Sequence, residues 1–179
     1  NPNSVTVGNY YTSEEDIVAS LNGVYTSLTQ SYVADNYHYF TDVRANATVV
    51  TNSGANSGIP YQFYNYTLTE ENVYVYNRYS QLYKIISRAN TLFAHLGDVS
   101  YATPSARDTY EAEARFLRAL SYYWLVTEWG DVPLVLKVLE STEEVRANNY
   151  RRPKAEIYQA IFDDLKYVTE SPLLDVQPA

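Results

Sequence analysis

The chain contains neither cysteine nor methionine among its 179 residues. Without cysteine there can be no disulfide, no thiol nucleophile and no thiolate metal site. Only two histidines occur, His38 and His95, and neither has a second ligand at zinc-site spacing, so we expect each to be an ordinary polar residue and predict no metal. No Ser-His-Asp order, glycine-rich phosphate loop or calcium loop is visible, so we predict neither a catalytic centre nor a cofactor.

Basic residues are also scarce, with 13 lysines and arginines against 21 acidic residues and a net charge of −8. This balance argues against a phosphate-binding stripe and against nucleic acid as a partner. No apolar run reaches the ~18 residues of a membrane span. The chain begins Asn1-Pro2-Asn3 without an initiator methionine, so we expect that a targeting segment has been removed upstream, and residues 173–179 suggest a cut just beyond a helix.

Tyrosine, in contrast, is abundant, with 20 residues in a chain that is 46% apolar and 19% charged. This composition is typical of one globular domain. A tyrosine side chain has a large flat face and a polar tip, which suits stacking on sugar rings as well as the packing of neighbouring helices. We expect most of these tyrosines to pack helices.

Apolar residues recur with helical spacing and predict four long helices, over residues 13–30, 69–96, 103–129 and 153–170. Ser13 and Asp16 form a capping-box-like start, and Thr69 is expected to cap the second helix, which ends at Gly97. Pro104 stands at the favoured first position of the third helix. The chain therefore belongs to the all-α class.

Small residues precede aromatic ones by four positions at Ala89, Ala112 and Ala119. A small residue lets a neighbouring helix approach, and we expect the aromatic residue four positions later to fill the remaining space, as in tetratricopeptide helix pairs. The predicted architecture is antiparallel helix pairs of degenerate tetratricopeptide type with long loops. For the helix over 69–96, the predicted inward face consists of Val73, Tyr76, Tyr83, Ile86, Ala89, Phe93 and Leu96.

Residues 31–47 are ambiguous and could form a further helix, whereas 48–66 read as a long loop with room for a short strand. Ordered loops of this length are usually functional. The candidate ligand-binding residues are Tyr61, Phe63, Tyr64, Asn65 and Tyr66 of this loop, together with Asp42 and Arg44 upstream. The aromatic rings could stack on sugar faces while Asn65 and Gln62 bind hydroxyls. Alternatively, the rings only anchor the loop to the helices, and Asp42 pairs with Arg44.

Other conspicuous side chains have simpler interpretations. We expect Glu111, Glu113, Arg115 and Arg118 to form buried guanidinium–carboxylate pairs between helices rather than an active site. Asp163 and Asp164 point about 100° apart on a helix and cannot act as a shared acid–base pair. Trp124 is expected in the core, and Trp129 at a structural turn before Gly130.

Several motifs follow one another in a recognisable order: Asn22-Gly23-Val24-Tyr25, residues 83–90 (YKIISRAN), residues 112–119 (AEARFLRA), residues 129–134 (WGDVPL) and Arg152-Pro153 before Ile157. Together they resemble the SusD/RagB family. The resemblance covers most of residues 13–170, although these motifs are scaffold motifs. It implies a SusD-like helical domain over 13–172, preceded by an extended lead-in over 1–12 and followed by a tail over 173–179.

The resemblance further implies a non-enzymatic glycan-binding lipoprotein on the extracellular face of a Bacteroidetes outer membrane, which delivers oligosaccharide to a TonB-dependent transporter. Members are typically much longer, so the chain corresponds to their N-terminal, tetratricopeptide-containing part, with the lipid-bearing cysteine upstream. Two alternatives stay open: a peptide-binding uptake protein of the RagB kind, and a helical-repeat domain that binds only another protein.

Overall fold

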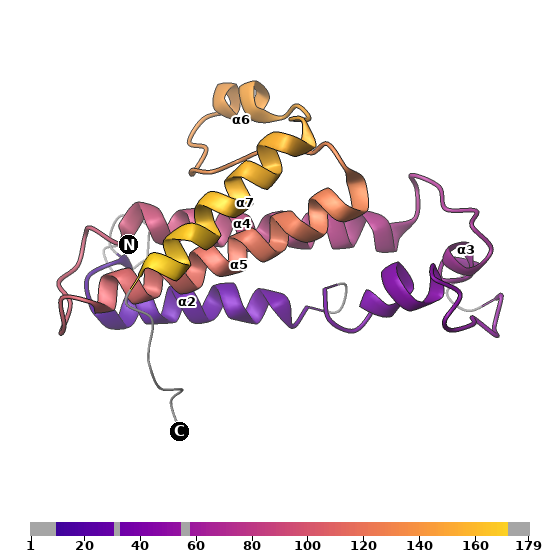
Figure 1. Cartoon of the computed structure of the whole chain (residues 1–179), viewed down its shortest axis with the longest axis horizontal. Helices are drawn as coiled ribbons and strands as arrows, with labels where there is room; N and C mark the ends of the chain where they lie inside the picture. The colour runs from indigo at the N-terminus through magenta and orange to yellow at the C-terminus, as the bar shows by residue number, and fades with distance from the viewer. Residues whose placement is uncertain (1–9, 31–32, 55–57, 172–179) are drawn as a thin grey trace, which may run out of the picture. The chain divides into compact units, whose positions relative to one another are not determined.

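The computed structural model describes residues 10–30, 33–54 and 58–171. Its regular secondary structure in these ranges is helical, as predicted (Figure 1). The helices are α2 (Glu14–Leu28), the π-helix η1 (Tyr39–Val43), α3 (Tyr61–Tyr64), α4 (Val73–His95), α5 (Ala106–Trp129), α6 (Thr142–Asn148) and α7 (Lys154–Glu170). No strand occurs within the described ranges, where one antiparallel bridge joins Val132 to Arg152. The chain divides into a large unit, residues 1–25 and 85–179, and a small unit, residues 26–84. No helix in the described part of the chain has the length and apolar character needed to cross a membrane.

Four long helices occur where the sequence predicts them, but two begin later. α4 begins at Val73 rather than Thr69, because the Asn72 side chain caps it by accepting hydrogen bonds from the backbone N–H groups of Tyr74 and Val75 (3.0 and 3.4 Å). α5 begins at Ala106, after a turn, rather than at Thr103. The expected tail, and the expected lead-in up to residue 9, lie outside the described residues.

The start of α2 confirms the capping prediction. One carboxylate oxygen of Asp16 accepts hydrogen bonds from the backbone N–H groups of Thr12 (3.0 Å) and Ser13 (2.9 Å) and from both hydroxyls. These bonds, those from Thr12 foremost, hold the pKa of Asp16 below its ordinary value. The helix therefore begins where the local sequence alone predicts it.

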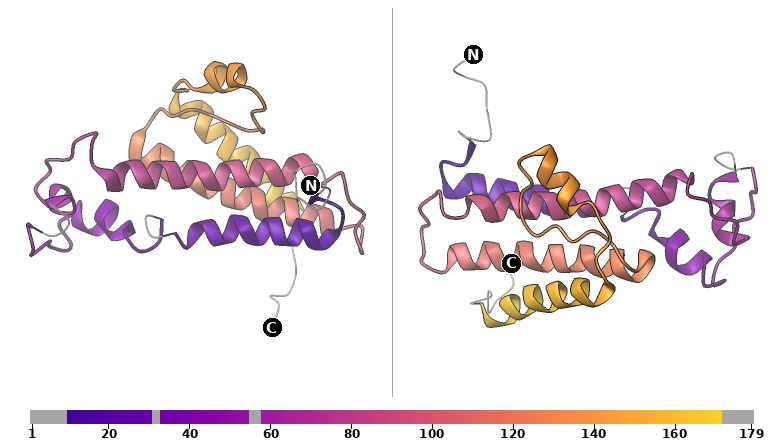
Figure 2. Two further views of the ribbon diagram at one scale, coloured as in Figure 1. Left: turned by 180° about the vertical axis from the view of Figure 1, so that it is seen from behind. Right: turned by 90° about the horizontal axis from the view of Figure 1, so that it is seen from above.

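In the large unit, α5 and α7 lie side by side and run in opposite directions (Figures 1 and 2). Helix α2 is joined to its neighbours by polar contacts: Arg88 of α4 donates to the Gly23 carbonyl (2.7 Å), and the Tyr25 hydroxyl donates to Glu113 of α5 (2.8 Å). The core of the unit includes Ile17, Leu21, Val24, Ile85, Ile86, Leu92, Leu117, Leu125, Ile157 and Ile161, all buried. Burial of these side chains is the main term that stabilises the unit.

The small residues behave as predicted, and Phe93, which follows Ala89, is partly buried, but the other two aromatic residues do not fill space in the core. Ala112 and Ala119 are almost completely buried, whereas Phe116 and Tyr123 are 47% and 49% exposed. A four-residue step advances about 40° around a helix, which is enough to turn these rings out of the core. They flank a shallow apolar groove of about 140 Å³ between α5 and α7.

The predicted inward face of α4 is wrong at its start, because Val73 and Tyr76 are exposed (38% and 67%). Tyr74 is buried instead, and so are two polar residues of the helix, Arg78 and Asn90. A pattern that counts only apolar residues cannot follow a face that includes buried polar ones. Trp124, expected in the core, is likewise only partly buried.

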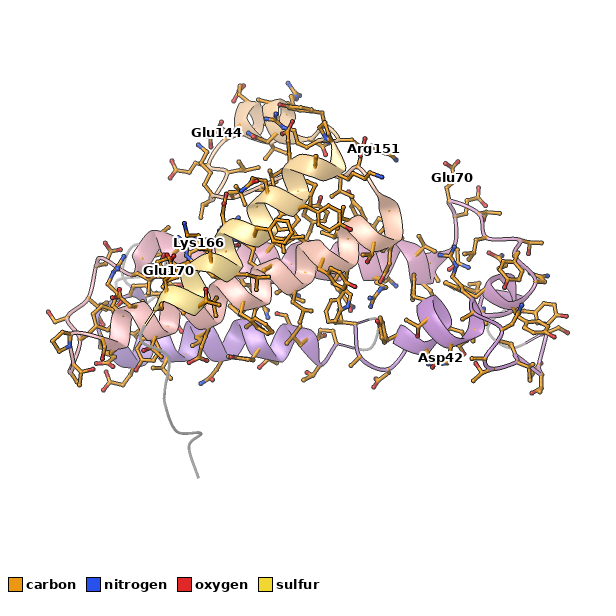
Figure 3. The ribbon with its side chains drawn as sticks, in the orientation of Figure 1. Asp42, Glu70, Glu144, Arg151, Lys166 and Glu170 are labelled. Atoms are coloured by element: carbon orange, nitrogen blue, oxygen red, sulfur yellow. The ribbon has the colours of Figure 1, made fainter. Side chains whose placement is uncertain are left out.

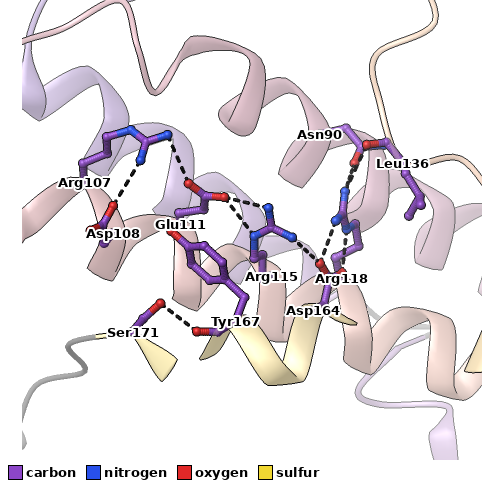
Figure 4. Close-up of polar contacts among 10 residues, drawn as sticks. All are labelled: Asn90, Arg107, Asp108, Glu111, Arg115, Arg118, Leu136, Asp164, Tyr167 and Ser171. Atoms are coloured by element: carbon purple, nitrogen blue, oxygen red, sulfur yellow. Dashed lines mark hydrogen bonds and ion pairs between the residues drawn. The ribbon is translucent and has the colours of Figure 1, made fainter. Parts of the chain in front are cut away.

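A chain of ion pairs connects α5 with α7 (Figure 4). Arg118 donates to both carboxylate oxygens of Asp164 (2.8 and 2.7 Å), and Arg115 joins Asp164 (2.8 Å) to Glu111 (2.7 Å). Asp164 is 2% and Arg118 5% exposed. Burial alone would lower the pKa of Arg115, but the neighbouring carboxylates, Glu111 foremost, raise it above its ordinary value. The predicted buried pairing is confirmed for Glu111, Arg115 and Arg118, with Asp164 as the partner on α7. Glu113 instead accepts a hydrogen bond from the Tyr25 hydroxyl.

The extended segment after Gly130 is fixed to the helices by polar side chains. Arg118 donates to the side-chain oxygen of Asn90 (2.7 Å) and to the Leu136 carbonyl (3.2 Å), and the Asn90 amide donates to the carbonyls of Val135 and Lys137 (3.0 and 3.2 Å). The Tyr122 hydroxyl bonds both backbone groups of Val135 (2.7 and 2.9 Å). The segment therefore depends on buried polar residues of α4 and α5.

Helix α6 was not predicted, although its start has a capping signal. Ser141 accepts a hydrogen bond from the backbone N–H of Glu144 (3.1 Å), and the Glu144 carboxylate accepts one from the backbone N–H of Glu140 (2.7 Å). None of the helix's residues is buried, so it lacks the apolar stripe by which the longer helices are found.

The ion pairs predict the effect of one substitution. Asp164→Ala leaves Arg118 buried without its carboxylate, and we expect a loss of about 3–5 kcal/mol in unfolding free energy. Asp163→Ala is the matched control, since Asp163 is exposed and accepts only a hydrogen bond from Gln159, so its change should stay within about 0.5 kcal/mol. Urea unfolding followed by circular dichroism measures both, and equal midpoints would contradict the assignment.

Candidate functional site

The small unit is built around a cluster of aromatic side chains. Phe63 is fully buried, and its ring lies 4.9 Å from that of Phe40 and 5.7 Å from that of Tyr39, measured between centroids. Val43 and Tyr74 complete the buried part of the cluster. Phe63, a candidate ligand-binding residue in the sequence, is therefore a core residue, because no face of its ring reaches the surface.

The stretch around Phe63 is a short helix rather than a loop or a strand. Pro60, whose φ of −65° is already helical, precedes α3, and its carbonyl accepts a hydrogen bond from the backbone N–H of Phe63 (3.2 Å). The Asn72 amide donates to the Ile59 carbonyl (3.1 Å) and to the side-chain oxygen of Gln62 (2.9 Å). The same side chain that caps α4 thus fixes α3, and the Gln62 oxygen is already engaged.

Tyr66 follows α3 in an unusual backbone conformation. Its φ of +58° is left-handed, a region in which glycine or asparagine is usual and which costs other residues about 1–2 kcal/mol. Its hydroxyl donates to the Arg44 carbonyl (2.7 Å), while the side chain is still 59% exposed. Strain at an exposed aromatic residue is a reason to suspect a functional role.

Two further rings lie on α3 itself. Tyr61 and Tyr64 are partly exposed, and their centroids are 5.6 Å apart at an angle of 46°. Asn65 is exposed, and its side-chain oxygen accepts a hydrogen bond from the Thr67 hydroxyl (2.6 Å), so its NH₂ group is the one directed to other partners. Tyr61, Tyr64 and Tyr66 therefore form a group of accessible rings beside an amide donor, which we name the tyrosine group.

Asp42, which Figure 3 labels, is exposed on η1, and Arg44 is exposed directly after that helix. The ion pairs of the described residues include none between the two, so their expected mutual pairing is not formed. The Asp42 carbonyl accepts the backbone N–H of Ala47 (2.8 Å), which closes the turn after η1. Through its carbonyl, Arg44 is joined to the tyrosine group.

The small unit also contains an open pocket of about 360 Å³, which we name the η1 pocket. It lies between η1, the segment 48–52 and Pro60, and His38 and Tyr39 contribute to its wall. Burial raises the pKa of the Tyr39 hydroxyl, so that group is a donor at neutral pH. Sequence reasoning missed this pocket, since the two apolar residues Val49 and Val50 in a polar stretch were its only signal.

The exposed side chains of this surface include aromatic rings, amides and hydroxyls. Rings, amides and hydroxyls can stack on and hydrogen-bond an uncharged polar ligand. No group of three or more metal-ligating side chains occurs within the described ranges. A helical scaffold whose small unit carries accessible tyrosines on a short helix defines the class of fold.

Comparison with known proteins places the chain within this class. A family model described as "Starch-binding associating with outer membrane" matches residues 6–171, and the chain belongs to this SusD-like family. SusD-like protein P2 of Formosa agariphila is 28% identical over 90% of this chain and 32% of its own length. The structure of a laminarin-binding SusD-like protein matches 88% of this chain and 34% of that one, with 28% identity and a TM-score of 0.73.

A second solved structure, a SusD-like protein from Bacteroides fragilis, matches 90% of this chain and 30% of its own with a TM-score of 0.74 and 21% identity, which supports the fold. The tetratricopeptide-like architecture and the predicted family are thus confirmed. The chain spans about a third of the length of the curated relatives it matches.

The core position of Phe63 gives a stability prediction. Phe63→Ala should lower the unfolding free energy by about 3–5 kcal/mol, because it opens a cavity in the aromatic cluster. Tyr76→Ala removes an aromatic side chain that is 67% exposed in the same unit and should change stability by no more than about 0.5 kcal/mol. Thermal unfolding of both variants measures the difference, and a Phe63→Ala variant as stable as the parent would refute the core assignment.

Proposed function

We propose that the chain is part of a non-enzymatic glycan-binding protein, and that the tyrosine group, Asn65, Asp42 and Arg44 form its contact surface. The observation that carries the proposal is that Tyr61, Tyr64 and Tyr66 lie on or directly after α3, a helix that is held in place by other residues of the small unit. Phe63 and Asn72 fix α3 from below, and the left-handed Tyr66 is held by its hydroxyl. Rings that are already fixed lose little entropy when a ligand binds.

The kind of ligand follows from the chemistry of these groups. Aromatic faces attract the C–H faces of sugar rings, and the Asn65 amide and the charged ends of Asp42 and Arg44 can bind hydroxyls. A relative of 28% identity is described as laminarin-binding, which agrees with an oligosaccharide ligand. The family description, starch-binding and associated with the outer membrane, agrees as well.

In the whole protein, this surface would hold oligosaccharide at the extracellular face of the outer membrane and deliver it to a TonB-dependent transporter. Attachment through a lipid upstream of the chain would account for membrane association. The membership of the chain in an outer-membrane family supports both steps.

A glycan array probed with the parent and with a Tyr61→Ala/Tyr66→Ala variant tests the proposal. We expect the variant to lose about 10-fold or more in affinity, which corresponds to roughly 1.4 kcal/mol for two accessible rings. Tyr64 is left in place, because it also packs against the core cluster.

Tyr76→Ala is the matched control, since it removes an exposed tyrosine of the same unit that lies outside the tyrosine group. Unchanged melting temperatures would show that the variants are folded. If Tyr76→Ala weakens binding as much as the double variant does, the contact surface is misplaced. If the parent binds peptides and no glycan, the peptide-binding alternative replaces the proposal, and release of reducing ends from any glycan would overturn the non-enzymatic assignment.

A further inference from the structure

The η1 pocket has a composition that differs from that of the tyrosine group. Its apolar wall consists of Val43, Val49, Val50 and Pro60. A volume of about 360 Å³ lies at the lower end of the range for small-molecule sites, roughly 300–1,000 Å³. A single sugar ring, with one apolar face and a rim of hydroxyls, is a ligand of this scale.

His38 supplies the most specific polar group of the pocket. Its Nδ1 atom lies 3.0 Å from the carbonyl oxygen of Asp35, and because a carbonyl can only accept, Nδ1 carries the proton. In the neutral imidazole the other nitrogen, Nε2, is then an acceptor without a proton. The ring is also fixed against Tyr39, with centroids 4.0 Å apart. His38 therefore adds a hydrogen-bond acceptor to the residues that line the pocket.

Donors are present as well. The side-chain oxygen of Asn52 accepts the backbone N–H of Gly54 (3.0 Å), which leaves its NH₂ group as the part of the amide that can serve a ligand. The hydroxyls of Thr48 and Thr51 line the same wall and can donate or accept. Sugar hydroxyls, which also do both, match this mixture.

Charge is missing from the wall. Among the described residues that line the η1 pocket there is no aspartate, glutamate, lysine or arginine, and neither Asp42 nor Arg44 is one of them. A carboxylate placed there would give up part of its hydration without gaining a lysine or arginine partner, which is unfavourable.

We propose that the η1 pocket is a subsite for one uncharged sugar residue, with His38 Nε2 as an acceptor for a hydroxyl, and that it rejects uronic acids. The inference rests on the proposed function, since the η1 pocket would give the proposed glycan-binding surface its selectivity for neutral sugars. The tyrosine group stacks along the oligosaccharide, and the η1 pocket binds one sugar residue and selects for its hydroxyl groups.

Nuclear magnetic resonance can test this directly, because the chain has only two histidines and His95 serves as an internal control. The probes are neutral methyl pyranosides (gluco, galacto, manno and xylo) and the matching methyl uronates, added at up to tens of millimolar. We expect at least one neutral pyranoside to shift the His38 ring resonances saturably while those of His95 stay unchanged. The matching uronate should bind at least about 10-fold more weakly.

His38→Phe keeps an aromatic ring against Tyr39 but removes the acceptor, and we expect a loss of about 10-fold in affinity for the same pyranoside. In this variant the titration is followed by the amide resonances of residues 48–52. If no pyranoside shifts His38, or if uronates shift it equally, the inference is overturned, even where the glycan array shows binding through the tyrosine group. If His38 responds while the array shows no oligosaccharide binding, the subsite stands and the proposed function fails.

Discussion

The bidentate pair between Arg118 and Asp164 is the contact on which the large unit depends. Both groups are buried, so each needs the other to offset the loss of hydration. The same guanidinium also bonds Asn90 and the Leu136 carbonyl, so one side chain joins α4, α5, α7 and the extended segment after Gly130. Such a pair adds little net stability over an apolar alternative, but its directional bonds specify which helices meet and in which register.

In the small unit, two side chains hold the elements together. Its long connection between α2 and α4 is fixed by Phe63 from the core side and by Asn72 from the start of α4. Tyr61, Tyr64 and Tyr66 remain accessible on or directly after the helix that these two side chains fix. A surface of this kind suits recognition of sugars, for which each contact is weak and preorganised contacts matter most.

The two halves of the proposed surface differ in what they can distinguish. Stacking on the tyrosine group depends on the presence of an apolar sugar face and tolerates many sugars. The η1 pocket, with the fixed imidazole of His38 and no charged lining, depends on the hydroxyl pattern and on the absence of a carboxylate. Affinity and selectivity would therefore come from different residues of one segment.

Much of the fold could be predicted from local patterns. Each of the features that predict the fold spans only a few residues. They are the capping of α2 by Asp16, the helical spacing of Ile157 and Ile161 in α7, and the scaffold motifs of the family. The errors are also local in origin. The predicted inward face of α4 is wrong only at its start, where Tyr74 and the polar Arg78 are buried instead of Val73 and Tyr76, and α6 has no buried stripe by which it could be predicted.

The candidate site shows where sequence stops being sufficient. Composition and order determined that the chain is helical, that it belongs to the SusD-like family and that aromatic residues gather near residues 61–66. Only the tertiary structure decided that Phe63 points into the core while Tyr66 points out, and that His38 shares a pocket with residues 48–52. The reason is physical: burial and pocket shape are set by contacts between residues far apart in the chain, which no local pattern records.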